Sequence, residues 1–125
     1  MKKIIVTKNA PEPIGPYSQA TQAGGFVFVS GQVAKDYATG KVVTDGIQSE
    51  TKMVMQNVKN ILETAGSSLD KVVKTTIFLT NMDDFAKMNE VYGSFFTGNY
   101  PARETVQVSK LPLNVNVEIS VIAVS

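Results

Sequence analysis

Residues Phe26–Val33 read FVFVSGQV, and this stretch decides the fold class. Its aromatic and β-branched residues favour a strand. Both faces of the strand are apolar at its start, a pattern typical of strands covered on both sides. Gly31 interrupts the pattern, and a glycine inside a strand marks either a bulge or the close approach of a ligand or another backbone. We therefore predict a central strand with an irregularity near its end.

Further strands and two helices are predicted on either side of this strand. The predicted strands are Lys3–Thr7, Val72–Leu79, Glu104–Val108 and Val115–Val124. Apolar residues at three-to-four spacing predict helices over Ile47–Ala65 and Asn81–Phe96. The apolar stripe of the first helix includes Val54, Val58 and Ile61, and the buried stripe predicted for the second consists of Phe85, Met88, Tyr92 and Phe95. Residues 9–25 contain three prolines and are predicted as an irregular loop, and residues 36–46 as a turn or hairpin.

The order strand, strand, helix, strand, helix, strand, strand predicts one α+β domain over residues 1–125, with two helices on one face of a mixed sheet. Two helices cover only one face of such a sheet. Apolar side chains nevertheless fall on both faces, at Phe26, Val27, Phe28, Val29, Ile122 and Val124. Because uncovered apolar faces usually mark subunit contacts, the pattern predicts an oligomer, either a dimer or a trimer.

Composition excludes several classes of chemistry. Hydrophobic residues make up 43% and charged residues 18%, as in globular domains. The net charge is +1 and the lysines are scattered, which argues against nucleic acid as a partner. Cysteine and histidine are absent, so no disulfide, thiol nucleophile, imidazole base or ordinary zinc site is available. The apolar run Ile4–Val6 is too short for a signal-peptide core, and a soluble cytoplasmic protein is expected.

Arg103 and Glu118 are the first candidates for chemistry. Arg103 is the only arginine, and a guanidinium can bind a carboxylate through two parallel hydrogen bonds. The alternative is an ordinary exposed arginine. Glu118 lies in the middle of an apolar strand, where burial would raise its pKa and suit it to act as a general base. The alternative is a residue on the solvent side of a one-sided strand.

Three further positions are weaker candidates. Tyr17 follows the rigid turn Gly15-Pro16 and could close a pocket or simply pack within its loop. Ser30 stands beside Gly31 in the interrupted strand. Asn89 lies inside the second predicted helix, where asparagine side chains usually face water.

Short motifs then follow one another in a recognisable order. They are GPYSQA at 15–20, VSGQ at 29–32, QNVKNIL at 56–62, KTTIFL at 74–79, MNEVY at 88–92, PAR at 101–103, LP at 111–112 and VEI at 117–119. With these motifs the sequence resembles the RidA/YjgF family of reactive intermediate deaminases over essentially its whole length.

The resemblance implies a chorismate-mutase-like α+β fold. It also implies a homotrimer whose sheets form a central barrel, with the helices outside and the active sites at the subunit interfaces. The implied reaction is hydrolysis of 2-iminopropanoate, derived from 2-aminoacrylate, and of 2-iminobutanoate to 2-oxo acids and ammonia. Neither a cofactor nor a metal is implied.

Site roles are carried over by the same resemblance. Arg103 would bind the substrate carboxylate, Glu118 would position or activate water from across the interface, and Tyr17 of the neighbouring chain would close the pocket. The pocket-lining positions are Ser30, Gly31, Asn89 and Thr105. Thr105 stands where many relatives carry cysteine, so no thiol role is expected. Glu104 stands where relatives often carry a small residue, and on a strand it should point away from the face of Arg103.

Two other functions remain open at this stage. One is a module that binds 2-oxo acids without turnover, as a sensor or regulator. The other is an RNA-directed translation inhibitor, against which the small net charge argues.

Overall fold

The computed structural model describes residues 1–125. Its strands are β1 (Lys3–Ile5), β2 (Ala20–Ala23), β3 (Phe26–Gln32), β4 (Val72–Leu79), β5 (Ala102–Gln107) and β6 (Val117–Val124). Its helices are α1 (Ile47–Thr64) and α2 (Phe85–Gly93), with short 3₁₀ turns η1 (Leu69–Lys71), η2 (Met82–Asp84) and η3 (Pro112–Asn114). The strands form one sheet in the order β1-β2-β3-β6-β4-β5, in which only β4 and β5 are parallel neighbours.

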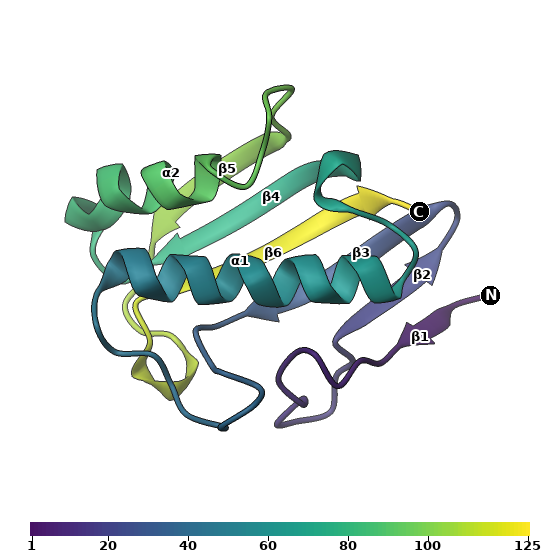
Figure 1. Ribbon diagram of the computed structural model, residues 1–125, viewed down its shortest axis with the longest axis horizontal. Coiled ribbons are helices and arrows are strands. Elements are labelled where there is room, and N and C mark those ends of the chain that lie inside the picture. Colours follow the sequence, from purple (N-terminus) through teal and green to yellow (C-terminus); the bar gives the residue numbers. More distant parts are fainter.

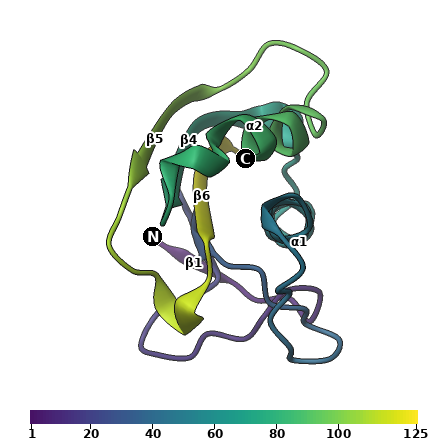
Figure 2. The ribbon, with the colours of Figure 1, turned by 90° about the vertical axis from the view of Figure 1, so that its left-hand side faces the viewer.

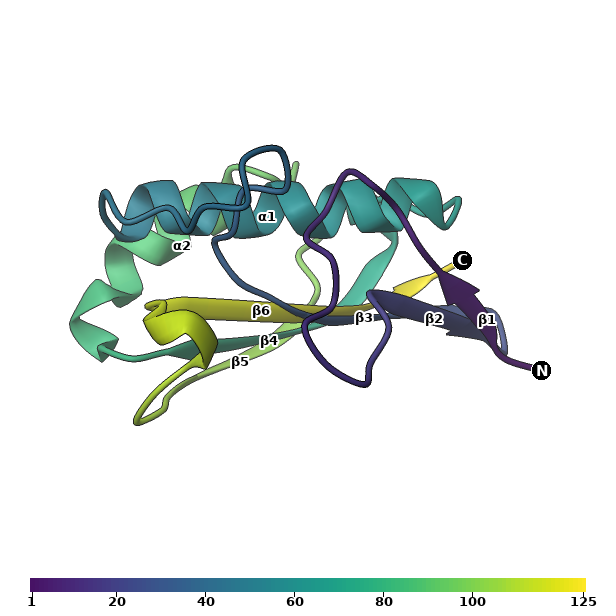
Figure 3. The same ribbon diagram turned by 90° about the horizontal axis from the view of Figure 1, so that it is seen from below.

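Both helices lie on the same face of this mixed sheet (Figures 1 and 3). The predicted apolar stripe of α1 includes Val54, Val58 and Ile61, which are fully buried, and the helix packs on β3 and β6. Gly66 follows the helix with φ +79°, a conformation that glycine adopts without strain and that commonly ends a helix. The predicted α+β architecture, with two helices on one side of a mixed sheet, is confirmed.

The opposite face of the sheet has no helix over it (Figure 3). Successive residues of a strand point to opposite faces. Phe26 and Phe28 alternate with the buried Val27 and Val29, so their side chains point away from the helices. Phe26 is accordingly 41% exposed and Phe28 43% exposed. The sequence predicted apolar residues on both faces of the sheet. In a single chain, the phenylalanines on the face without helices are therefore exposed to solvent.

One predicted loop contains a strand that the sequence pattern did not indicate. The prediction of an irregular segment over residues 9–25 is wrong for β2, which has the sequence ATQA. Thr21 is its only residue of the aromatic and β-branched types that favour strands, and the strand is held by backbone pairing with β1 on one side and β3 on the other. Pairing with neighbours, which a single-sequence pattern does not contain, decided this element.

The second helix is shorter than predicted. The side chain of Asn81 accepts a hydrogen bond from the backbone N–H of Asp83 at 2.9 Å, so it caps the turn η2, and α2 begins only at Phe85 and ends at Gly93. Strand β4 matches the prediction at both ends, and α1 and the other predicted strands differ from it by one or two residues at one or both ends. A bridge between Lys35 and Val42 closes the segment 36–41 of the predicted turn. Neither helix has the length and apolar character that crossing a membrane requires.

Candidate active site

The side chain of Arg103 is held against helix α2. Its Nη1 group donates a hydrogen bond to Oδ1 of Asn89 at 2.7 Å. Its Cζ atom lies 5.7 Å from the ring centroid of Phe85 and 5.1 Å from that of Tyr92, within the range of cation–π attraction. Arg103 is therefore a partly buried, organised group rather than an ordinary exposed arginine, and Asn89 is its partner rather than a residue that faces water.

An open pocket of about 360 Å³ adjoins this guanidinium at the edge of the sheet. The residues that line it are Asn89, Tyr92, Gly93, Tyr100, Pro101 and Arg103. Figure 2 shows α2 next to the β4–β5 edge of the sheet, and these two parts of the chain supply Asn89, Tyr92 and Arg103 to the pocket. Because a guanidinium carries five N–H donors, the bond to Asn89 leaves donors for a planar anion such as a carboxylate.

The sheet register sets which residues share the face of Arg103. Arg103 lies opposite Thr75 of β4, and Thr105 lies opposite Ile77, so both side chains of β5 point toward the helix side. The hydroxyl oxygen of Thr105 is buried and has no hydrogen-bond partner within the chain. A buried polar atom without a partner is uncommon, and this one lies two residues from the arginine.

Glu104 points to the other face, as the alternation predicts. Its Oε1 lies 3.1 Å from Nζ of Lys74, and its other oxygen accepts a hydrogen bond from the hydroxyl of Thr76. These hydrogen bonds, with that of Thr76 the larger influence, lower the pKa of Glu104. Glu104 therefore makes no ion pair with Arg103 and leaves the guanidinium free for a ligand.

Glu118 lies on the face of the sheet that the helices leave uncovered. Its neighbours in β6, Val117 and Ile119, are fully buried in the core, so the alternation turns the glutamate to the opposite face. The carboxyl group is half-buried there, and this burial raises its pKa. A glutamate with a raised pKa is a better proton acceptor than an ordinary one.

The Glu118 carboxyl group lies in space that a side chain at position 31 would occupy, and Gly31 has none. A Cβ atom at Gly31 would lie 2.7 Å from both Cδ and Oε2 of Glu118, closer than real Cβ atoms come to other atoms. The β3–β6 register also shifts between Val29 and Gln32, so the strand is irregular at this point. The register shift agrees with the interpretation of Gly31 as a bulge, whereas the group that comes close to it within the chain is the Glu118 side chain rather than a ligand or another backbone.

Tyr17 and Ser30 lie near one another on the same side of the molecule. Ser30 Oγ donates to the carbonyl oxygen of Ser18 at 2.6 Å, and both Tyr17 and Ser30 line a shallow pocket of about 370 Å³. The Tyr17 side chain is 50% exposed. The buried Gln19 fixes this loop, because its amide bonds the backbone of Thr7 and of residues 10–11.

The seven residues predicted for the site thus fall into two groups. The arginine group, on the helix-covered face at the β5 edge, consists of Arg103, Asn89 and Thr105. The glutamate group, at the uncovered face, consists of Glu118, Gly31, Ser30 and Tyr17. Within one chain the structure places Arg103 against Asn89, Gly31 against Glu118, and Tyr17 beside Ser30, but it does not bring the arginine group to the glutamate group.

Sequence reasoning missed the aromatic surroundings of Arg103. Phe85 and Tyr92 were both expected in the buried stripe of the second helix. Tyr92 is buried, but that expectation is wrong for Phe85, which is 37% exposed because it lies beside the arginine at the surface. The spacing of Phe85, Asn89 and Tyr92, at i, i+4 and i+7, could have indicated that all three share one side of the helix.

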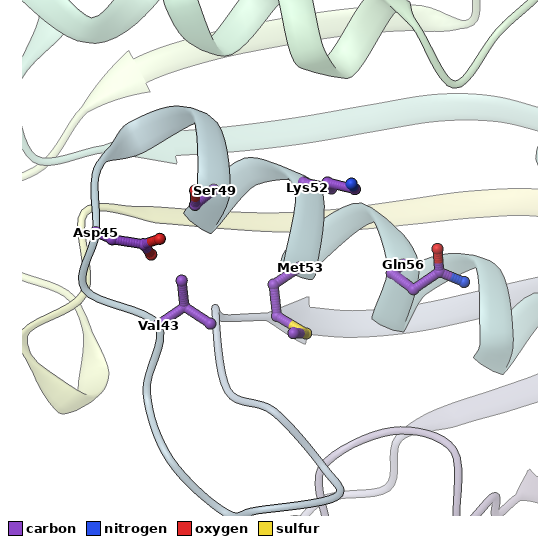
Figure 4. Close-up of a pocket in the computed structure, with 6 residues that line it drawn as sticks. All are labelled: Val43, Asp45, Ser49, Lys52, Met53 and Gln56. Atoms are coloured by element: carbon purple, nitrogen blue, oxygen red, sulfur yellow. The ribbon is translucent and has the colours of Figure 1, made fainter.

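Another pocket of about 400 Å³ lies at the start of α1 (Figure 4). It is lined by Val43, Asp45, Ser49, Lys52, Met53 and Gln56. None of the predicted site residues reaches it. The chain also has no group of three acidic side chains placed to hold a metal ion. The pocket beside Arg103 is therefore the better candidate for anion chemistry.

Comparison with known proteins places the fold and the site in context. The family model described as Endoribonuclease L-PSP matches residues 7–125. A RutC family protein of Pyrococcus horikoshii is 53% identical over 98% of both chains. The 2-iminobutanoate/2-iminopropanoate deaminase of Mus musculus is 44% identical, over 99% of this chain and 92% of the mouse protein.

Solved structures give the same result. The structure of YyfA from Yersinia pestis, described as a member of the conserved Rid protein family, superimposes with a TM-score of 0.98 at 45% identity and covers 100% of both chains. Escherichia coli TdcF, solved with bound serine, superimposes with a TM-score of 0.95 at 44% identity over 98% of both chains. The fold defines a small α+β protein of the Rid type. The chain belongs to the RidA/YjgF family, to which the Endoribonuclease L-PSP model corresponds.

Proposed function

We propose that the protein is an imine deaminase that hydrolyses 2-iminopropanoate and 2-iminobutanoate to 2-oxo acids and ammonia. The observation that carries the proposal is the Arg103 guanidinium, oriented by Asn89 in an open pocket at the sheet edge. A 2-imino acid carries the planar carboxylate that such a guanidinium binds in two-point fashion. The mouse relative that bears this activity in its name supports the same reaction.

The chemistry requires little beyond orientation and one base. An iminium carbon is already electrophilic, so a water molecule can add to it once the water is positioned and can lose a proton. Glu118 would accept that proton, because the burial that raises its pKa makes it a stronger base. The protonated Glu118 would then return its proton to the nitrogen of the carbinolamine, and the C–N bond would break. The departing ammonia takes up the hydroxyl proton, which leaves the carbonyl of the 2-oxo acid. No covalent enzyme intermediate is needed, in keeping with a chain that lacks cysteine and histidine.

The proposed site is shared between two copies of the chain. Arg103 and Glu118 lie on opposite faces of one sheet, so a ligand that touches both must lie between two chains. The uncovered face carries Phe26 and Phe28, more than 40% exposed each, and offers the apolar contact that such an assembly needs. We propose a homotrimer in which the arginine group of one copy meets the glutamate group of the next, with Tyr17 closing the pocket.

Ammonia and 2-oxo acid release from freshly generated 2-iminobutanoate tests the proposed reaction. The wild type is expected to accelerate release, whereas Arg103→Ala should lose most of that acceleration and keep its assembly state. Arg103→Lys is the matched variant, because it keeps the charge and loses the two-point geometry. An Arg103→Ala protein as active as the wild type would contradict the proposal, and a wild type that accelerates nothing would exclude it.

A binding module without turnover is the second candidate. The structure of TdcF with bound serine shows that a protein of this fold holds a small molecule with a carboxylate. A binding module would show affinity for 2-oxo acids that depends on Arg103 but not on Glu118. Calorimetry with 2-oxobutanoate on Arg103→Ala and Glu118→Gln separates the two functions when turnover is measured beside it.

Ribonuclease activity, which the family model's description raises, receives less support from these residues. The net charge is +1, and Arg103 is the only arginine. No cluster of arginines therefore surrounds it to bind phosphates. Binding to RNA that weakens steeply with salt would speak for such an activity.

A further inference from the structure

One stripe of α2 meets the guanidinium of Arg103 at three successive points. Phe85, Asn89 and Tyr92 are separated by four and three residues, so their side chains lie along one side of the helix. The ring centroids of Phe85 and Tyr92 both lie within 6 Å of Arg103 Cζ. Asn89, which lies between these two residues in the sequence, accepts the hydrogen bond from Nη1. The arginine is thus supported by rings as well as by a polar partner.

Tyr92 is itself held rigidly. The residue is only 4% exposed, and its hydroxyl donates a hydrogen bond at 3.0 Å to Oγ1 of Thr75, a fully buried residue of β4. The ring of Phe96 packs against it with centroids 5.0 Å apart. Burial raises the pKa of Tyr92, so its hydroxyl stays protonated and keeps donating. The Tyr92 ring therefore links the centre of the sheet to the arginine at its edge.

We propose that Tyr92 and Phe85 are positioning residues, whose rings hold the Arg103 guanidinium in the orientation that a substrate carboxylate requires. This inference rests on the proposed function and concerns the same site. Asn89 occupies one edge of the guanidinium, and the rings restrict its remaining rotation, so the free N–H donors face the pocket. A donor set fixed before binding loses less freedom when the ligand arrives, which strengthens binding of a planar carboxylate.

The first test reads the arginine directly. Because Arg103 is the only arginine, its ¹⁵Nε–¹Hε signal can be assigned without ambiguity in the full assembly. The wild type and Tyr92→Phe, which keeps the ring and loses only the hydroxyl, are expected to show a high order parameter at Nε. In Tyr92→Leu the order parameter should fall below roughly 0.6, a value typical of flexible groups.

The second test reads ligand binding. We expect Tyr92→Leu to raise KM for 2-iminobutanoate and Kd for 2-oxobutanoate by about tenfold, with a much smaller change in kcat, because ground-state and transition-state binding of the carboxylate are weakened alike. KM does not depend on the fraction of folded enzyme, so a purely structural defect would leave it unchanged. Phe95→Leu is the matched control, since Phe95 is a half-buried core residue of the same segment without a ring contact to Arg103.

An Arg103 as rigid in Tyr92→Leu as in the wild type, with unchanged KM and Kd, would overturn the proposal. If Tyr92→Leu fails to fold, Phe85→Leu carries the test, because Phe85 is partly exposed and its truncation leaves the core intact. In Phe85→Leu the order parameter of Arg103 Nε is then expected to fall. An unchanged order parameter in that variant would overturn the proposal. The NMR measurement needs no substrate. An inactive wild type would therefore exclude the proposed deaminase reaction, while the positioning role of Tyr92 and Phe85 would still be tested by the order parameter of Arg103.

Discussion

Arg103 and Glu118 point to opposite faces of the same sheet. The arginine, on β5, lies against the rings and the amide of α2, whereas the carboxyl group of Glu118, on β6, occupies the face without helices. Strand β4 separates β5 from β6 in the sheet. A single chain therefore cannot direct both groups at one small ligand, and this separation is the structural reason for proposing a shared site.

Mixing two inactive variants tests the shared site. Arg103→Ala and Glu118→Gln should each be nearly inactive alone, but unfolding and refolding them together should restore activity. With random mixing, about a quarter of the sites in a cyclic assembly receive an intact Arg103 from one copy and an intact Glu118 from the next. Ammonia release from 2-iminobutanoate measures the recovery. If mixed assemblies form and remain as inactive as the parents, both groups must act within one chain.

The raised pKa of Glu118 predicts a stability change with a definite sign. The folded protein binds the Glu118 proton more tightly than the unfolded chain does, so stabilisation from this group is complete in acid and is lost as the pH rises through the folded pKa. Glu118→Gln should therefore have a higher Tm than the wild type at neutral pH. The difference should shrink toward pH about 4, the ordinary range of glutamate.

Glu104→Gln is the control with the opposite sign. Hydrogen bonds from Thr76 and Lys74 lower the pKa of Glu104, so its stabilisation is present above the ordinary pKa of a glutamate and is lost as the pH falls through the lowered value. This variant should gain nothing at neutral pH. Equal Tm shifts for Glu118→Gln at acidic and neutral pH would contradict the assignment of a buried carboxyl group.

Gly31→Ala should impair catalysis through Glu118. The added Cβ would lie 2.7 Å from the carboxyl carbon, so the carboxyl group has to move. A misplacement of about 1 Å can cost on the order of a hundredfold in rate, and we expect a loss of roughly tenfold to a hundredfold in kcat. A double-mutant cycle provides the check, because Gly31→Ala should cost little more once Glu118→Gln is present. Full additivity of the two losses would show that Gly31 acts independently of Glu118.

Phe28→Glu should weaken the assembly without unfolding the chain. Phe28 is 43% exposed on the uncovered face, so the substitution creates no cavity in the core of a single chain, but it would place a charge in the proposed subunit contact. Burying a phenylalanine stabilises by about 1.5–3 kcal/mol, which an unpaired buried charge more than offsets. Light scattering after size-exclusion chromatography should show smaller particles. Gln48→Glu on the exposed side of α1 adds the same charge and should leave the particle size unchanged.

The arginine pocket could be predicted only in part from the sequence. The single arginine and the resemblance singled out Arg103 and Asn89 together. Phe85 and Tyr92, which contact the arginine, were both predicted as core residues. Helical spacing shows which residues share one side of a helix, but it does not show which of them lie at the edge of the sheet beside Arg103. The orphaned hydroxyl of Thr105 and the Lys74–Glu104 pair depend on strands brought together from distant parts of the chain.

Local patterns in the sequence predicted both helices and every strand except β2. Apolar periodicity placed α1 within one residue, and β-branched composition placed β4 without error. Alternation in the strand around Glu118 turned that residue away from its buried neighbours. These features are local, because each depends on residues a few positions apart. Tertiary structure decided that ATQA becomes β2, that Gly31 accommodates the Glu118 carboxyl group, and that the arginine and glutamate groups lie on opposite faces. Those outcomes depend on strand order and register, which arise from backbone pairing between segments far apart in the chain and leave no periodic signal in either segment.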